Sequence, residues 1–73
     1  MPSVAKHRRA LGEKVRFYRR LAGLTQEKLA EKAELAPSYV SDIERGEENV
    51  SADTLARIVK ALDIKFENLF DGF

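Results

Sequence analysis

The chain has 73 residues, with 13 Lys and Arg against 12 Asp and Glu, a net charge of +1 and no cysteine. A chain of this length forms one small domain, close to the lower limit for folding without crosslinks. Without cysteine it has neither a disulfide framework nor a thiolate metal site. No apolar run is long enough for a membrane span, and no signal-peptide pattern follows Met1. We therefore expect a soluble, cytoplasmic protein built from packed helices.

The charge is unevenly distributed along the chain. Residues 1–20 contain a single acid, Glu13, and a run of basic residues: Lys6, Arg8, Arg9, Lys14, Arg16, Arg19 and Arg20. The rest of the chain is net acidic. Such a distribution allows one face to bind phosphates while another keeps the protein soluble. The alternative is an arginine-rich helix face that is simply solvated.

The first predicted helix covers residues 8–22. Four apolar residues recur at the helical period and define one buried face: Leu11, Val15, Tyr18 and Ala22. Phe17 lies off this face; it packs under the C-terminal tail, lies at a dimer contact or is exposed, and we favour the core or an interface. Residues 1–7 have no clear apolar period, so they form either a basic arm or a frayed helix start. His7 has no second candidate ligand beside it, and we predict no metal site.

Residues 25–46, TQEKLAEKAELAPSYVSDIERG, are predicted to form two short helices joined by a tight turn. Thr25 is a suitable N-cap for the first helix. Pro37 suits the first position of the second helix, where its missing N–H would have no partner. The small side chains of Ala30 and Ala33 allow the two helices to approach closely.

The second of these helices has a polar outer side. Once Val40 and Ile43 face the core, the other side chains point outward or sideways: Pro37, Ser38, Tyr39, Ser41, Asp42 and Arg45. A helix of this kind suits a polar groove better than a protein core. Ser38 and Asp42 lie one turn apart on this outer side.

The same stretch resembles the Cro/lambda-repressor type of helix-turn-helix. The matching residues are Leu24, Thr25, Gln26, Leu29, Ala30, Ala33, Leu35, Tyr39, Val40, Ser41, Ile43, Glu44 and Gly46. The resemblance extends through the flanking helical segments, from Leu11 to Phe70. It implies an all-α, compact five-helix lambda-repressor-like DNA-binding domain over residues 8–73, with the helix-turn-helix as helices 2 and 3.

The resemblance also implies roles for individual residues. Gln26 opens the first motif helix, where its counterpart in the family hydrogen-bonds a phosphate. Arg19 matches an arginine that pairs with the glutamate near the end of the second motif helix, here Glu44. The base-edge candidates are then Pro37, Ser38 and Asp42, and the phosphate or positioning candidates are Gln26, Tyr39, Ser41, Arg45, Asn49 and Arg19.

Two of the base-edge candidates are not typical hydrogen-bond donors to bases. Pro37 stands where the family has a glutamine or arginine; it cannot make their hydrogen bonds, although its ring can contact a thymine methyl. Asp42 can accept from a cytosine amino group, or turn aside to bond Arg45 or Tyr39. With so few direct donors, water and DNA shape would supply much of the selectivity.

The C-terminal third is predicted to hold two further helices. Ser51 is a suitable N-cap for the first, which has an apolar stripe of Leu55, Ile58, Val59 and Leu62. Residues 65–70 form a short last helix. The dimer-interface candidates are Phe66, Leu69, Phe70 and Phe73. A two-fold dimer would place two recognition helices about 34 Å apart, one DNA turn. The alternative is that these phenylalanines only close the core of the monomer.

We therefore predict a sequence-specific double-stranded DNA-binding transcriptional regulator, a homodimer that inserts residues 37–45 into the major groove of a palindromic operator. The alternative is a protein-interaction module on the same fold, of the antitoxin or bridging-factor type. The sequence contains no recognisable catalytic set, phosphate loop or metal spacing, so we expect no enzyme activity, cofactor or small-molecule ligand. Phage immunity, restriction–modification control and toxin–antitoxin pairs are all compatible settings.

Overall fold

The computed structural model describes residues 2–70, with side chains from Lys6 onward. It contains four α-helices and one 3-10 helix: α1 (Pro2–Leu21), α2 (Gln26–Ala33), α3 (Pro37–Glu44), α4 (Ala52–Leu62) and η1 (Phe66–Leu69). Within this described range there is no strand, and no helix is long and apolar enough to cross a membrane. The all-α fold and the motif on helices 2 and 3 are confirmed, and the short fifth helix that the sequence predicts is a 3-10 helix.

The last helical segment is only one turn long. Its amides bond three residues back, from Asn68 N to Lys65 O at 3.0 Å and from Phe70 N to Glu67 O at 3.0 Å. The side chain of Asn68 also folds back on the start of the segment, where its Oδ1 accepts from Lys65 N at 2.8 Å. Short connectors of this kind adopt 3-10 geometry, so the short last helix predicted over residues 65–70 is present as a 3-10 helix over Phe66–Leu69.

Helix α1 begins at Pro2, well before the predicted start. Proline suits the first helical position, and the backbone of residues 2–7 continues the helix instead of forming an extended arm. At the other end, Gly23 adopts a left-handed φ of 74°. This conformation lets Leu24 N bond to Arg19 O at 3.0 Å. The helix therefore ends at Gly23, which tolerates positive φ without steric cost.

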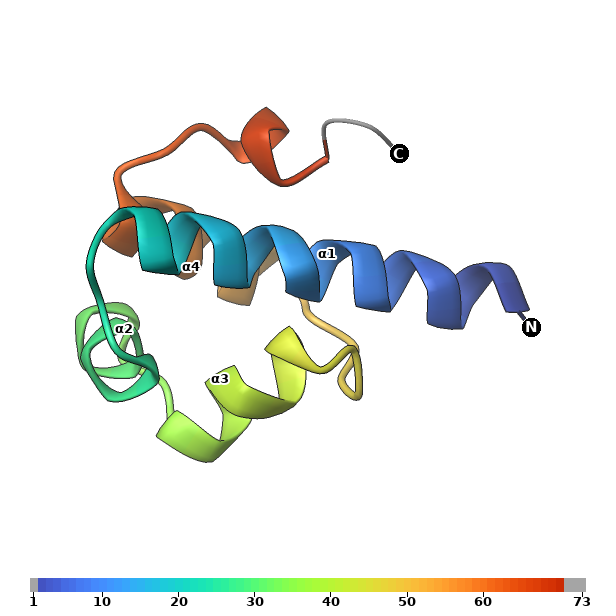
Figure 1. The fold of residues 1–73 in the computed structure, drawn as a ribbon, viewed down its shortest axis with the longest axis horizontal. Helices are drawn as coiled ribbons and strands as arrows, with labels where there is room; N and C mark the ends of the chain where they lie inside the picture. The colour runs from blue at the N-terminus through green and yellow to red at the C-terminus, as the bar shows by residue number, and fades with distance from the viewer. Residues whose placement is uncertain (1, 71–73) are drawn as a thin grey trace.

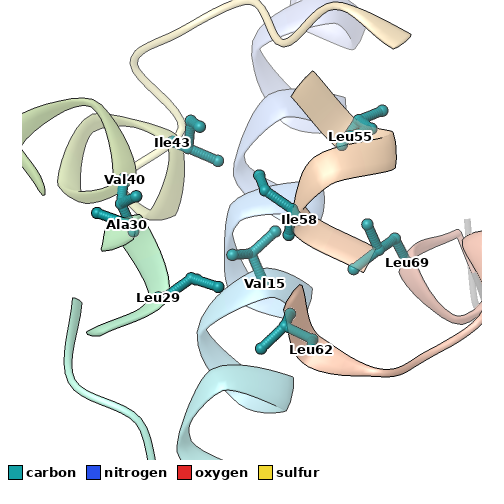
Figure 2. Close-up of a cluster of buried hydrophobic side chains, with 9 residues drawn as sticks. All are labelled: Val15, Leu29, Ala30, Val40, Ile43, Leu55, Ile58, Leu62 and Leu69. Carbon is teal, nitrogen blue, oxygen red and sulfur yellow. The ribbon is translucent and has the colours of Figure 1, made fainter. Parts of the chain in front are cut away.

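The core lies between α1, the two motif helices and α4, and η1 closes it (Figure 2). Its buried members are Val15, Leu29, Ala30, Val40, Ile43, Leu55, Ile58, Leu62 and Leu69. Burying an aliphatic side chain of this size is worth roughly 1.5–3 kcal/mol relative to leaving it exposed. Every element contributes to this cluster. The buried side of α3 is therefore packed against the other helices.

Helix α3 lies beside α1 (Figure 1). Their close approach depends on Gly12, because a Cβ placed there would lie 2.3 Å from the backbone oxygen of Ile43 and 2.7 Å from that of Glu44. No side chain fits in this space without moving one of the helices. The contact fixes the C-terminal end of α3 against α1.

The turn between α2 and α3 is formed by Glu34, which adopts a left-handed conformation with φ 58° and ψ 47°. The next amide, Leu35 N, bonds to Ala30 O at 2.8 Å. Ala30 and Ala33 are 1% and 2% exposed, so both small side chains are buried. The motif thus has the tight turn that the sequence predicts.

Candidate nucleic-acid interface

Helix α3 has a buried side and an outer side. Val40 and Ile43 are 0% and 1% exposed and anchor the helix in the core. The other predicted contact residues of the helix are exposed or half-buried: Pro37, Ser38, Tyr39, Ser41 and Asp42. Ser38 and Asp42 are one turn apart, and Arg45 follows at the C-cap, so these three share one side of the helix.

The guanidinium of Arg45 is held by three neighbours on this outer side. Its Nε donates to Glu47 Oε1 at 3.2 Å. Its Nη1 donates to Ser41 Oγ and its Nη2 to Asp42 Oδ1. Asp42 therefore accepts a hydrogen bond from Arg45. Arg45 is one of the two protein partners that the sequence analysis named for Asp42 as alternatives to a DNA base. Two carboxylates surround one cation, and the local charge is negative.

Behind this surface, Glu44 is the buried partner of Arg19. Arg19 Nε donates to Glu44 Oε2 at 2.6 Å, and Nη2 donates to Oε1 at 3.1 Å. The third guanidinium nitrogen, Nη1, donates to Leu24 O at 2.8 Å. Arg19 and Glu44 are only 8% and 3% exposed. The predicted pair is present, and its bidentate geometry ties the end of α3 to α1.

Two further side chains contact the carboxylate of Glu44, and neither contact was predicted from the sequence. Gln26 Nε2 donates to Glu44 Oε1 at 3.0 Å, and Arg16 Nε lies 3.5 Å from the same oxygen. Arg16 stands one helical turn before Arg19, and this i, i+3 spacing is the sequence signal for a shared partner. The carboxylate therefore joins α1, the first residue of α2 and the last residue of α3.

These surroundings decide the ionisation of Glu44. Burial alone would raise the pKa of its carboxyl group. The hydrogen bonds from Arg19 and Gln26, the charge of Arg19 and the proximity of Arg16 outweigh burial and lower the pKa from its ordinary value of 4.5. Glu44 is consequently ionised at neutral pH in the folded protein.

Three other predicted side chains lie outside these networks. Asn49 is exposed in the loop between α3 and α4, and Tyr39 is half-buried against the core. Phe17, assigned from the sequence to the core or an interface, is 57% exposed on α1. Its ring meets that of Tyr18 edge-on, with centroids 5.0 Å apart. Among the described residues, no cluster of acidic or histidine side chains could hold a metal ion.

The predicted dimer candidates at the C-terminal end divide into two kinds. Phe66 and Phe70 are 40% and 39% exposed, and their rings stack with centroids 5.7 Å apart. Leu69 is fully buried, so it is a core residue and is not available on the surface for a partner. Phe73 lies outside the described residues.

Two short helices joined by a tight turn, with the second anchored from behind and polar outside, define a DNA-binding domain of the helix-turn-helix class. The chain matches the helix-turn-helix family over residues 15–69, and it belongs to this family. It is a helix-turn-helix DNA-binding transcriptional regulator, and its relatives are regulators and not enzymes.

Three similar proteins place the chain within the family. It is 46% identical over 61 residues to control protein C.BamHI of Bacillus amyloliquefaciens, covering 82% of this chain and 75% of that protein. The restriction-modification controller protein C.AhdI of Aeromonas hydrophila has a TM-score of 0.85 and 40% identity, covering 86% of this chain and 96% of that chain. The biofilm regulator SinR, solved in complex with DNA, has a TM-score of 0.79 and 37% identity, covering 84% and 98%.

Proposed function

We propose that this regulator acts as a homodimer on a palindromic operator and inserts residues 37–45 of each subunit into the major groove, N-terminal end first. The observation that carries the proposal is the two-sided character of α3, with Val40 and Ile43 buried and Ser38 exposed. A helix fixed to the body by one side presents the other side to a groove of helix width. The structure of SinR with DNA supports a duplex as the partner.

Within this proposal, the side chains divide into base readers and positioning residues. Ser38 and Asp42 contact base edges, while the ring of Pro37 contacts a thymine methyl. Gln26 holds the first turn of α2 against a phosphate, with free amide groups at the helix start beside it. Arg19 has too little exposure to reach a phosphate, and it acts by bracing the end of α3.

The remaining contacts belong to the duplex backbone. Tyr39 and Ser41 flank the reading side of α3, and Asn49 projects from the loop that follows. Polar side chains in such places fix the register of the protein on the duplex and carry little sequence information. Arg45 joins them only when it leaves Asp42 and Glu47, because it is bonded to both in the unbound protein.

We further infer that the regulated genes belong to a restriction–modification system. The relative from Bacillus amyloliquefaciens and the structure from Aeromonas hydrophila are both controller proteins, and this chain covers 75% and 96% of them. A duplex taken from upstream of a neighbouring endonuclease or methyltransferase gene should then be bound in a gel-shift assay. A gene neighbourhood without either enzyme would contradict this assignment.

The reading mechanism is tested by selecting bound duplexes from a random pool. The selected sequences should contain an inverted repeat, and Ser38→Ala should change the preference at one base pair of each half-site, by roughly 1–3 kcal/mol. Gln26→Ala should weaken binding to all duplexes by a similar factor, because a phosphate contact carries no sequence information. Equal, unselective losses from both variants would contradict the division between reading and positioning residues.

A further inference from the structure

We propose that Arg16 is a further phosphate-binding residue of this regulator, and that its guanidinium and the side-chain amide of Gln26 form one subsite for a DNA backbone phosphate beside Glu44. This inference deepens the function proposed above, on which it rests. It adds a contact from α1, outside the helix-turn-helix, and it gives Glu44 the task of holding that subsite together.

The first argument is the balance of charge around Glu44. One carboxylate faces two guanidinium groups. Arg19 makes two hydrogen bonds to it, at 2.6 and 3.1 Å, and a third to Leu24 O. Arg16 Nε lies 3.5 Å from Oε1, longer than an ordinary hydrogen bond. Arg19 therefore neutralises Glu44, and Arg16 adds a positive charge that the carboxylate does not offset.

The second argument is the difference in exposure between the two arginines. The side chain of Arg19 is 10% exposed, whereas that of Arg16 is 39% exposed. Arg16 approaches Glu44 through Nε, the nitrogen nearest its aliphatic stem. A guanidinium can bind a carboxylate on one edge and a phosphate on another, because its five N–H groups point outward in one plane.

The third argument is location. Gln26 Nε2 and Arg16 Nε approach the same oxygen of Glu44, so the two side chains are neighbours although they come from different helices. Gln26 is the first residue of α2, and Glu44 is the last residue of α3. Figure 1 shows α3 running beneath α1, with α2 near the C-terminal end of α1. A backbone that meets Gln26 therefore passes within reach of Arg16.

The experiment compares Arg16→Gln with the unaltered protein on the selected operator and on a scrambled duplex, over a series of salt concentrations. Losing one phosphate contact should weaken binding to both duplexes by similar factors and reduce the slope of log K against log salt by about 0.9. Arg16→Lys should keep most of the slope, since it retains the charge. The thermal midpoint of Arg16→Gln should stay close to that of the unaltered protein, because Glu44 keeps Arg19 and Gln26.

The matched control is Arg57→Gln, which removes one arginine from α4. Arg57 donates to Glu34 O and lines a hollow with Lys32 and Lys60, beyond the far end of α2. An equal salt slope for Arg16→Gln and Arg57→Gln would overturn the inference, and so would a lowered midpoint with an unchanged slope. If the unaltered protein binds no duplex, the proposed function fails as well; if it binds and the Arg16→Gln slope is unchanged, only this inference fails.

Discussion

At the scale of single residues, Glu44 joins three helices through one carboxylate. It ends α3, pairs with Arg19 of α1 and accepts from Gln26 at the start of α2. Removing one partner of a buried ion pair costs roughly 3–5 kcal/mol, since the other charge is left without compensation. The same group positions α3, the helix proposed to read DNA, and sets part of the stability.

The variant Glu44→Gln should have a weaker dependence of stability on pH. The folded protein lowers the pKa of Glu44 below its ordinary value of 4.5, so the stabilisation is present above that value and is lost as pH falls through the folded pKa. Thermal unfolding between about pH 7 and about pH 3 should show a midpoint that falls more steeply for the unaltered protein than for Glu44→Gln. The exposed Glu31→Gln is the control, and parallel curves for all three proteins would contradict the role of Glu44.

A second prediction concerns Asp42 and its contact with Arg45. Asp42→Asn should raise affinity for non-operator duplexes, because it loosens the hold on the guanidinium of Arg45 and removes a negative charge from the reading side. The side chains are 49% and 35% exposed for Arg45 and Asp42, so the pair is worth about 0–1 kcal/mol and the gain should be roughly two- to fivefold. Fluorescence anisotropy with a scrambled duplex measures it.

The control for this prediction is the same substitution in an Arg45→Gln background. If Asp42 acts through Arg45, the gain from Asp42→Asn should shrink there, because no cation remains to be released. An equal gain in both backgrounds would mean that Asp42 acts on DNA only through its own charge.

At the scale of elements, the position of α3 depends on how closely it packs on α1. The backbone oxygens of Ile43 and Glu44 lie where a side chain on Gly12 would have to go. Protein interiors are densely packed, so a displacement at this contact moves the whole helix. The close contact therefore links a glycine in the middle of α1 to the position of α3, the helix proposed to read DNA.

Gly12→Ala should destabilise the protein although the same change normally favours a helix by about 1 kcal/mol. The new Cβ would lie 2.3 Å from Ile43 O, and overpacking of this kind costs roughly 1–3 kcal/mol. Urea unfolding measures the change, with the exposed Glu13→Ala on the same helix as the control. A stabilised Gly12→Ala variant would show that the two helices are further apart in solution.

The motif helices could be predicted because each carries its own local signals. The hydroxyl of Thr25 caps α2 by accepting from Lys28 N at 3.0 Å, and Pro37 begins α3 as expected. The early start of α1 could not be predicted in the same way, since residues 2–7 have no apolar period. The 3-10 helix is equally hard to foresee, because a one-turn segment has no repeat to recognise.

Of the contacts in the candidate site, only those between residues that match the family pattern could be predicted. The pair of Arg19 and Glu44 follows from the resemblance, and both side chains do meet. The contacts of Gln26 and Arg16 with Glu44 depend on how α1, α2 and α3 converge, which no local pattern encodes. Leu69 was predicted at the dimer interface, but it lies in the core. The sequence could not decide between the two, because an apolar residue in a short last helix is equally compatible with a core and with an interface.

At the scale of the whole molecule, the described residues of one chain offer one helix, α3, for the proposed reading of DNA. The extents of the structure are 32 × 23 × 21 Å, so a single chain is about as long as one DNA turn, roughly 34 Å. It cannot place reading helices in two successive major grooves. The proposed palindromic operator, with its two half-sites, would therefore need two chains, each with a surface that contacts its copy. The stacked rings of Phe66 and Phe70 are the exposed apolar candidates at the C-terminal end of the described chain.

Phe70→Ala should shift the protein from dimer to monomer and weaken operator binding with it. A central aromatic anchor of an interface contributes about 2 kcal/mol or more, so the dissociation constant of the dimer should rise at least roughly thirtyfold. Sedimentation equilibrium measures that constant. Phe17→Ala is the matched control, since Phe17 is also exposed but lies on α1. A dimer that survives Phe70→Ala and dissociates with Phe17→Ala would place the two-fold axis at α1, and the spacing between the reading helices would then have to be derived from that helix.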